Sequence, residues 1–306
     1  MPDSRVDASA TWTRAVLLGG QGRYAAAETL LRRLRAGPGV PVALRAHAAV
    51  SRASHLRQVG AHGRATVFDA AAAHLARVPA GDRAPEPGSD RDGTGPAAAL
   101  GDALAGLAAD AIGRRDAPTA ERMLHRAASW CGVRGDEPPA SRTAVRWLWV
   151  RAETSLLTGD ADGAVRASAT ARRLAVLLGS PRHVLKSRLV HAVARAVAGD
   201  PDPGELDAVA VEADAAGLLP LRWAALVACL AFPEADGSPG TGGGPGRPNG
   251  RHAEESRVDT LSRQAVAQSR RHAAMVALNV LYLRSDPVAR AGMRESAWLP
   301  AADAVP

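Results

Sequence analysis

Between positions 142 and 153 the chain carries residues whose types and spacing suit the binding of a carboxylate. They recur at intervals of four, three and four, so a helix places them on one stripe: Arg142, Arg146, Trp149 and Glu153. Guanidinium groups bind a carboxylate through paired N–H···O bonds and stack on an indole ring. We therefore predict that Arg142, Arg146 and Trp149 bind an acidic partner. The alternative is that Trp149 is buried between helix pairs and the arginines form a solvated face.

A second candidate group for partner binding follows on the next predicted helix pair. Arg188, His191 and Arg195 lie on one helical face. Residues 141–199 contain ten basic and three acidic residues, a net charge of +7 that equals the charge of the whole chain. Residues 200–214 contain six acidic residues and no basic one. Such segregation steers an acidic partner toward the basic region. The alternative is that the acidic residues cap a helix N-terminus and pair with basic neighbours.

We expect pairs of helices to position both candidate groups of partner-binding residues. The predicted pairs are 11–20 with 23–35, 41–59 with 64–78, 97–113 with 118–131, 141–157 with 162–178, and 181–198 with 203–216. In three pairs, alanines stand 12 residues apart on the two helices: Ala15 and Ala27, Ala108 and Ala120, Ala152 and Ala164. Small residues at a fixed place let two antiparallel helices approach closely. We predict an all-α stack of antiparallel helix pairs.

The remaining pairs are expected to follow the same pattern less closely. In the second pair, Phe68 is expected where the first has Ala27. Ala120, Ala164 and Ala208 give a spacing of 44 residues twice over, so Ala208 is expected at the packing position of its helix.

Two stretches interrupt the helical patterns. Residues 79–96 and 232–252 are rich in glycine and proline, with few large apolar side chains, so we predict flexible insertions there. The predicted organisation is a helical array over 10–231 interrupted at 79–96, a linker at 232–252, C-terminal helices at 253–286 and a tail at 287–306.

The first pair resembles a tetratricopeptide repeat. It has Trp12 early in its first helix, the small Ala15 at the packing point, Gly22 and Tyr24 at the turn and Ala27 on the second helix. The segment from Trp149 to Pro181 is similar. The usual unit has about 34 residues, so the longer spacing looks like the divergent repeats of bacterial signalling and transcriptional regulators. The resemblance implies a curved solenoid that binds proteins or peptides in a concave groove.

The composition and the motifs of the chain give little support to an enzymatic function. The charge of +7 and a pI of about 10.7 favour polyanions, but Lys186 is the only lysine, and excess arginine with alanine, glycine and proline is typical of a GC-rich genome. No metal-binding or nucleophile motif occurs, and Cys131 and Cys229 read as small buried hydrophobes. Residues 20–25 fit a dinucleotide fingerprint, but no acidic residue follows between 29 and 68 to hold a ribose, so a repeat turn is preferred.

These observations predict a non-enzymatic adaptor or regulatory protein that binds an acidic protein or peptide segment, with no cofactor and no metal. The N-terminal residues lack an apolar signal region and no apolar run is long enough to span a membrane, so a cytoplasmic location is expected. Two alternatives stay open. One is nucleic-acid binding by the basic face of residues 141–199, and the other is a small-ligand sensor.

Overall fold

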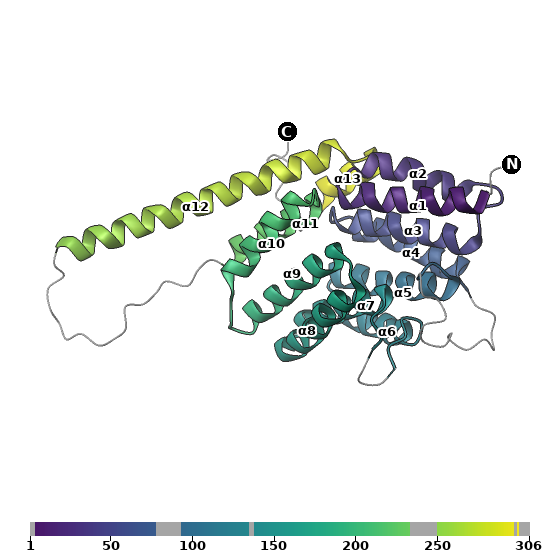
Figure 1. The fold of residues 1–306 in the computed structure, drawn as a ribbon, viewed down its shortest axis with the longest axis horizontal. Helices are drawn as coiled ribbons and strands as arrows, with labels where there is room; N and C mark the ends of the chain where they lie inside the picture. Colours follow the sequence, from purple (N-terminus) through teal and green to yellow (C-terminus); the bar gives the residue numbers. More distant parts are fainter. Residues whose placement is uncertain (1–3, 78–92, 135–137, 233–249, 297–298, 300–306) are drawn as a thin grey trace.

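All regular structure in the computed structural model is helical within the residues it describes, which are 4–77, 93–134, 138–232, 250–296 and 299. The helices are α1 (Ser4–Gly20), α2 (Tyr24–Ala36), α3 (Val42–Arg57), α4 (His62–Leu75), α5 (Pro96–Gly113), α6 (Ala117–Ala128), α7 (Arg142–Leu157), α8 (Ala161–Leu178), α9 (Pro181–Val197), α10 (Pro203–Ala215), α11 (Leu219–Ala231), α12 (Gly250–Leu283) and α13 (Pro287–Glu295). Consecutive helices pack as antiparallel pairs, as predicted (Figure 1).

The larger differences from the predicted organisation occur at three places. The first helix starts at Ser4, before the predicted array begins, and α12 starts at Gly250, within the predicted linker. Helix α13 lies in the predicted tail. It forms because the Asp286 carboxylate accepts hydrogen bonds from the amides of Val288 and Ala289 (3.1 and 3.2 Å), with Pro287 in the first turn. Most of each predicted insertion, 78–92 and 233–249, lies outside the described residues.

The 12-residue spacing of packing residues holds in all five pairs. Each of the following residues is fully buried: Ala15 and Ala27, Ala53 and Ala65, Ala108 and Ala120, Ala152 and Ala164, Ala194 and Leu206. Two expectations were therefore wrong. Ala65, not Phe68, corresponds to Ala27, and Leu206, not the half-buried Ala208, occupies the packing position of α10. Every second helix is thus held against its first helix at the same point.

Residues with a left-handed backbone conformation lie in the turns between the two helices of a pair. Gly22, Gly60 and Gly159 stand five residues before the buried alanine of the second helix and have positive φ angles of 71°, 76° and 79°. Arg115 stands at the same place in the third pair with φ 59°, the one described residue other than glycine with positive φ. Such a conformation costs a non-glycine residue about 1 kcal/mol, so the fixed turn geometry outweighs the preference of the side chain.

The first helices of the pairs form an inner layer, defined here as α1, α3, α5, α7, α9 and α11. Each contacts the next first helix directly, whereas among the described helices the second helices α2, α4, α6, α8 and α10 make no comparable contacts with one another. These contacts indicate that the array curves with the first helices on its inner side. The curve also brings its two ends together, because α11 contacts α1.

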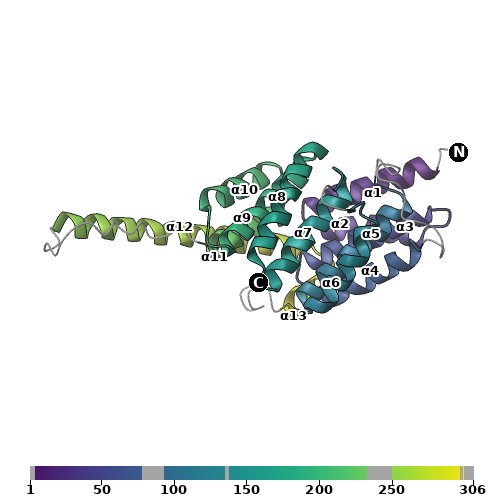
Figure 2. The same ribbon diagram turned by 90° about the horizontal axis from the view of Figure 1, so that it is seen from below.

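The C-terminal helices complete this arrangement. The end of α12 packs with α11, and Leu278 and Leu281 share a core cluster with Tyr24 of α2 and Leu56 of α3. The rest of α12 projects away from the body, as both Figure 1 and Figure 2 show. Arg52 of α3 bonds both carboxylate oxygens of Asp286, at 2.7 and 2.9 Å, which fixes the start of α13.

Candidate anion-binding site on the inner layer

Two arginines of α7 hold a carboxylate, but that carboxylate belongs to the chain itself. Arg142 donates to Asp102 Oδ2 of α5 at 2.5 Å, and Arg146 Nη1 lies 3.3 Å from Asp102 Oδ1. Burial opposes the ionisation of Asp102, but the two arginines outweigh it and hold its pKa below the usual value. The predicted chemistry of the arginine pair is therefore present, with an internal ligand.

The two arginines are engaged to different degrees. Arg142 also donates from Nη2 to the carbonyl of Gly93 at 2.6 Å. Arg146 forms no ion pair other than the one with Asp102 within the described part of the chain, and about a quarter of its side chain (23%) is exposed. A guanidinium has five N–H donors, so Arg146 keeps donors for a further acceptor.

Trp149 lies in the contact between α7 and α9. Its indole N–H donates to Ser187 Oγ at 2.8 Å, and its ring stacks on His183 with centroids 5.3 Å apart. The ring is half-buried and packs with both core clusters that join α7, α8 and α9. Trp149 therefore acts mainly as a packing residue between helix pairs, which is the alternative considered from the sequence.

The stacked His183 brings a further arginine, Arg182, into the same region. Arg182 follows Pro181 at the start of α9 and is half-buried. Its guanidinium carbon lies 3.8 Å from the position that a Cβ on Gly20 of α1 would take. It forms no hydrogen bond or ion pair with any residue that the structure describes. Burial and the nearby charge of Arg146 both lower its pKa.

We define the inner basic cluster as Arg142, Arg146, Arg182 and His183. Burial and the neighbouring arginines lower the pKa of His183 to about 4, so this imidazole is neutral at neutral pH. Among the described carboxylates, only that of Asp102 pairs with any of these three guanidinium groups, through Arg142 and Arg146. The cluster carries an excess of positive charge on the inner layer.

The second predicted group, Arg188, His191 and Arg195, does not join this cluster. Arg188 bonds both carboxylate oxygens of Glu205 at 2.7 and 3.0 Å and also Glu212 at 2.8 Å. Arg195 pairs with Asp200 at 2.7 Å. These contacts tie α9 to residues 200–214, the acidic segment. The segregated charges of the sequence are thus matched within the fold.

His191 of the second predicted group and Asp202 of the acidic segment are also held by contacts within the fold. His191 Nδ1 lies 3.0 Å from Ser168 Oγ of α8. Asp202 caps α10 by accepting from the amide of Glu205 at 3.0 Å. Capping and local pairing, the alternative considered for the acidic segment, describe its contacts well.

A second buried ion cluster lies beside the first. Arg57 at the end of α3 donates to Asp69 of α4 and, at 3.1 Å, to Asp110 of α5, and both carboxylates are fully buried. Burial and the neighbouring Asp110 raise the pKa of Asp69 to about 7, against the opposing effect of Arg57. This cluster joins three helices and presents no unused cation.

The sequence contained one signal for the buried ion clusters. Asp102 and Asp110 are the only charged residues in the 18 residues of α5, an otherwise apolar helix. A buried carboxylate needs a cationic partner, so these two positions predict arginines on the neighbouring helices. Arg182 gave no comparable signal, because its importance comes from helices far apart in the sequence.

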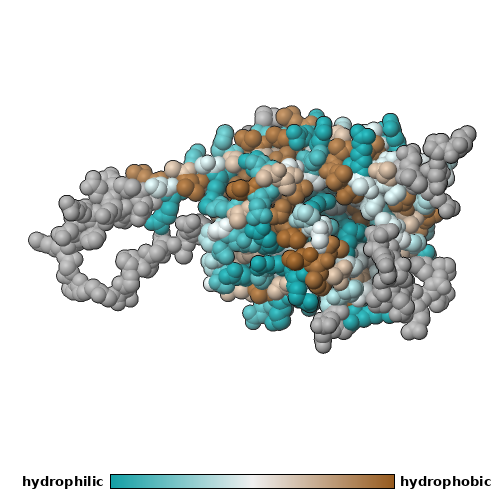
Figure 3. Space-filling view, in the orientation of Figure 1, coloured by the Kyte–Doolittle hydropathy of each residue, from teal (hydrophilic) through white to brown (hydrophobic). Residues whose placement is uncertain are grey.

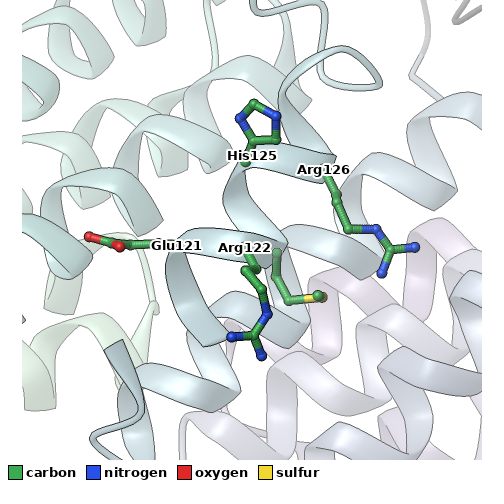
Figure 4. A pocket seen from close by; sticks show the side chains of 5 residues that line it. Glu121, Arg122, His125 and Arg126 are labelled. Carbon is green, nitrogen blue, oxygen red and sulfur yellow. The ribbon is translucent and has the colours of Figure 1, made fainter. Parts of the chain in front are cut away.

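The surface elsewhere offers weaker candidates. A shallow concavity lies over α6, but the side chains that line it all come from that helix, and those labelled in Figure 4 point in different directions. Hydrophobic and hydrophilic residues are intermixed on the face shown in Figure 3. The exposed Leu17, Val67 and Val211 come from three different helices, α1, α4 and α10. Charge, rather than a continuous apolar surface, distinguishes the inner layer.

Among the described residues, no group of three or more histidine, cysteine, aspartate or glutamate side chains is arranged to hold a metal ion. None of the described helices combines the length and the apolar content needed to cross a membrane. No family model matches the chain, and no curated protein or solved structure is significantly similar to it.

Proposed function

We propose that this chain is a non-enzymatic adaptor or regulatory protein, built as a tetratricopeptide-like solenoid, that binds an acidic segment of another protein on its inner layer. The observation that carries the proposal is the excess positive charge of Arg142, Arg146 and Arg182 over the one described carboxylate that pairs with them, that of Asp102. Charge-assisted hydrogen bonds from arginine to carboxylate are among the stronger polar contacts in proteins.

The internal contact of Asp102 supports this choice of ligand chemistry. Arg142 and Arg146 already bind one carboxylate from two directions. A glutamate or aspartate of a partner finds the same kind of donor in the remaining N–H groups of Arg146 and in Arg182. The inner layer is held by fully buried packing residues, so binding requires little rearrangement.

The distribution of ion pairs favours a protein partner over nucleic acid. Arg188 and Arg195 of the basic segment 141–199 are paired with Glu205, Glu212 and Asp200. Part of the basic segment is therefore neutralised within the fold, and its remaining positive charge is divided between the inner layer and exposed arginines of α8, Arg166, Arg172 and Arg173. A duplex would need several phosphate contacts along one continuous basic face.

Fluorescence anisotropy with a labelled glutamate-rich peptide tests the proposal. We expect the peptide to bind at low salt, and Arg182→Gln to weaken binding about tenfold, the loss of one charge-assisted hydrogen bond. Arg182 is preferred over Arg142 as the site of substitution because a change at Arg142 leaves the buried Asp102 without its main partner.

The matched control is Arg173→Gln, because Arg173 is exposed on α8 and has no described partner. It should bind the peptide as the wild type does. Absence of peptide binding at low salt contradicts the proposal, and so does equal weakening by both variants. Preferential binding of a DNA duplex, with affinity that falls steeply with salt, supports the nucleic-acid alternative instead.

A further inference from the structure

Arg182 differs from three other arginines on the helices of the inner layer. Arg52 bonds Asp286, Arg57 bonds Asp69 and Asp110, and Arg142 bonds Asp102. Arg182 is half-buried, yet it forms no ion pair with a described carboxylate. Partial burial of a cation without a counter-charge is costly, and the nearby charge of Arg146 adds repulsion.

Two titratable groups near Arg182, Tyr24 and His55, are uncharged, so they do not compensate the positive charge of its guanidinium. Burial raises the pKa of the Tyr24 hydroxyl, which donates to Gln58 Oε1 at 3.1 Å, so the phenol stays neutral. Burial and the charge of Arg182 lower the pKa of His55 to about 3, so this ring is neutral as well. Neither of these two described groups therefore supplies a negative charge, and the chemistry of the position suits an anion from outside.

The position of Arg182 is also special in the fold. Its side chain extends from α9 to Gly20 at the end of α1, next to Leu218, whose Cδ2 lies 3.5 Å from the position of a Cβ on Gly20. Leu218 directly precedes α11, which contacts α1. Arg182 thus lies where the two ends of the array meet, and we call this place the closure seam.

We propose that Arg182, together with Arg146, binds one small oxoanion, a carboxylate or a phosphate, at the closure seam. The planar guanidinium of Arg182 offers two parallel N–H donors to such a group. The bound anion neutralises the repulsion between the two arginines. Bound beside Gly20, it also strengthens the approach of α9 to the end of α1.

Thermal unfolding in sodium phosphate, in sodium glutamate and in sodium chloride of equal ionic strength tests this site. We expect phosphate or glutamate to raise the Tm of the wild type by a few degrees over chloride, because a ligand that binds only the folded state stabilises it. Arg182→Gln should show no such response. In chloride its Tm should equal or exceed that of the wild type, because an uncompensated cation is removed.

Two further variants keep the result interpretable. Arg173→Gln on the outer surface should respond to phosphate as the wild type does. Arg182→Lys keeps the charge but loses the planar pair of donors, so its response should be reduced. Isothermal titration of the wild type with phosphate should give one site per chain. Equal responses of the wild type and Arg182→Gln overturn the proposal, as does a Tm of Arg182→Gln in chloride well below that of the wild type.

The experiment separates this site from the adaptor function. If phosphate or glutamate binds through Arg182 while the acidic peptide does not bind, the site stands as a small-anion site and the adaptor function fails. If the peptide binds with equal affinity to wild type and Arg182→Gln, and neither anion changes the Tm, the oxoanion site fails. A response to the peptide but to neither free anion also rejects the small-anion site.

Discussion

The imidazole of His55 lies directly against Gly19, so that a Cβ added to Gly19 would overlap the ring. Both residues are buried, and their contact joins α3 to the end of α1. We expect Gly19→Ala to destabilise the protein by about 1–3 kcal/mol, the usual cost of overpacking a core. Urea denaturation of the purified variant measures this change in the free energy of unfolding.

Gly63 provides the matched control for this prediction. It is exposed in the first turn of α4, and an added Cβ would meet nothing within 4 Å. Gly63→Ala should therefore be neutral or stabilise the protein by up to about 1 kcal/mol. If Gly19→Ala is as stable as Gly63→Ala, His55 does not pack against Gly19 as described.

Arg57 is expected to be the most sensitive member of the buried cluster with Asp69 and Asp110. Arg57→Met leaves two buried carboxylates facing each other, which costs about 3–5 kcal/mol. Asp69→Asn should cost less, because the raised pKa of Asp69 means that an uncharged group is well tolerated there. Chemical denaturation of both variants at neutral pH compares them. A smaller loss for Arg57→Met than for Asp69→Asn would contradict this account.

Four histidines with lowered pKa values should make the protein unstable in acid. The pKa values are lowered, chiefly by burial, to about 4 for His47, His62 and His183 and to about 3 for His55. In the unfolded chain these groups take up protons below about pH 6.5, so each lowers the free energy of unfolding by roughly 1.4 kcal/mol per pH unit below that value. Denaturant titrations at stepped pH should show stability falling from about pH 6.5 toward the folded pKa values.

Asp69 has the opposite effect on the free energy of unfolding over part of this pH range. Its folded pKa of about 7 exceeds its unfolded value, so the folded state holds the extra proton and Asp69 adds stability as the pH falls. Asp69→Asn removes this contribution. The variant should therefore lose stability more steeply with acid than the wild type. If the free energy of unfolding does not change between neutral pH and the pKa values of the four histidines in the folded state, those pKa values are not lowered as described.

Asp286 has two roles that a single substitution removes together. It pairs with the buried Arg52, which is 2% exposed, and it caps α13. Asp286→Ala should cost about 3 kcal/mol or more. It should also speed hydrogen exchange at the amides of Val288 and Ala289. Glu295→Ala is the control, since its ion pair with Arg64 is exposed and worth less than about 1 kcal/mol. Similar losses for the two variants would count against the role of Asp286.

The helix pairs could be predicted from the sequence because local rules determine them. Ala152 and Ala164 stand 12 residues apart with a glycine turn between them, and both are fully buried as that spacing requires. The register of weaker pairs was harder to assign. Leu206 occupies the position that alanine takes in the other pairs, so the alanine pattern predicts Ala208 instead.

The use of each arginine could not be predicted in the same way. Arg146 and Arg188 look alike in sequence, but Arg146 pairs with Asp102 of α5 within the inner layer, and Arg188 pairs with Glu205 and Glu212 of α10. The difference depends on how successive pairs rotate about one another. That rotation arises from the summed packing of many side chains and is not encoded in the spacing along one helix.

The contact between α1 and α11 limits how this architecture can grow. An open row of repeats lengthens by adding units at either end, because each unit touches only its neighbours. Here an extra unit would push α11 away from α1 and separate Leu218 from Gly20. The number of units is therefore fixed by the meeting of the two ends, and duplication within the gene would produce a different molecule rather than a longer one.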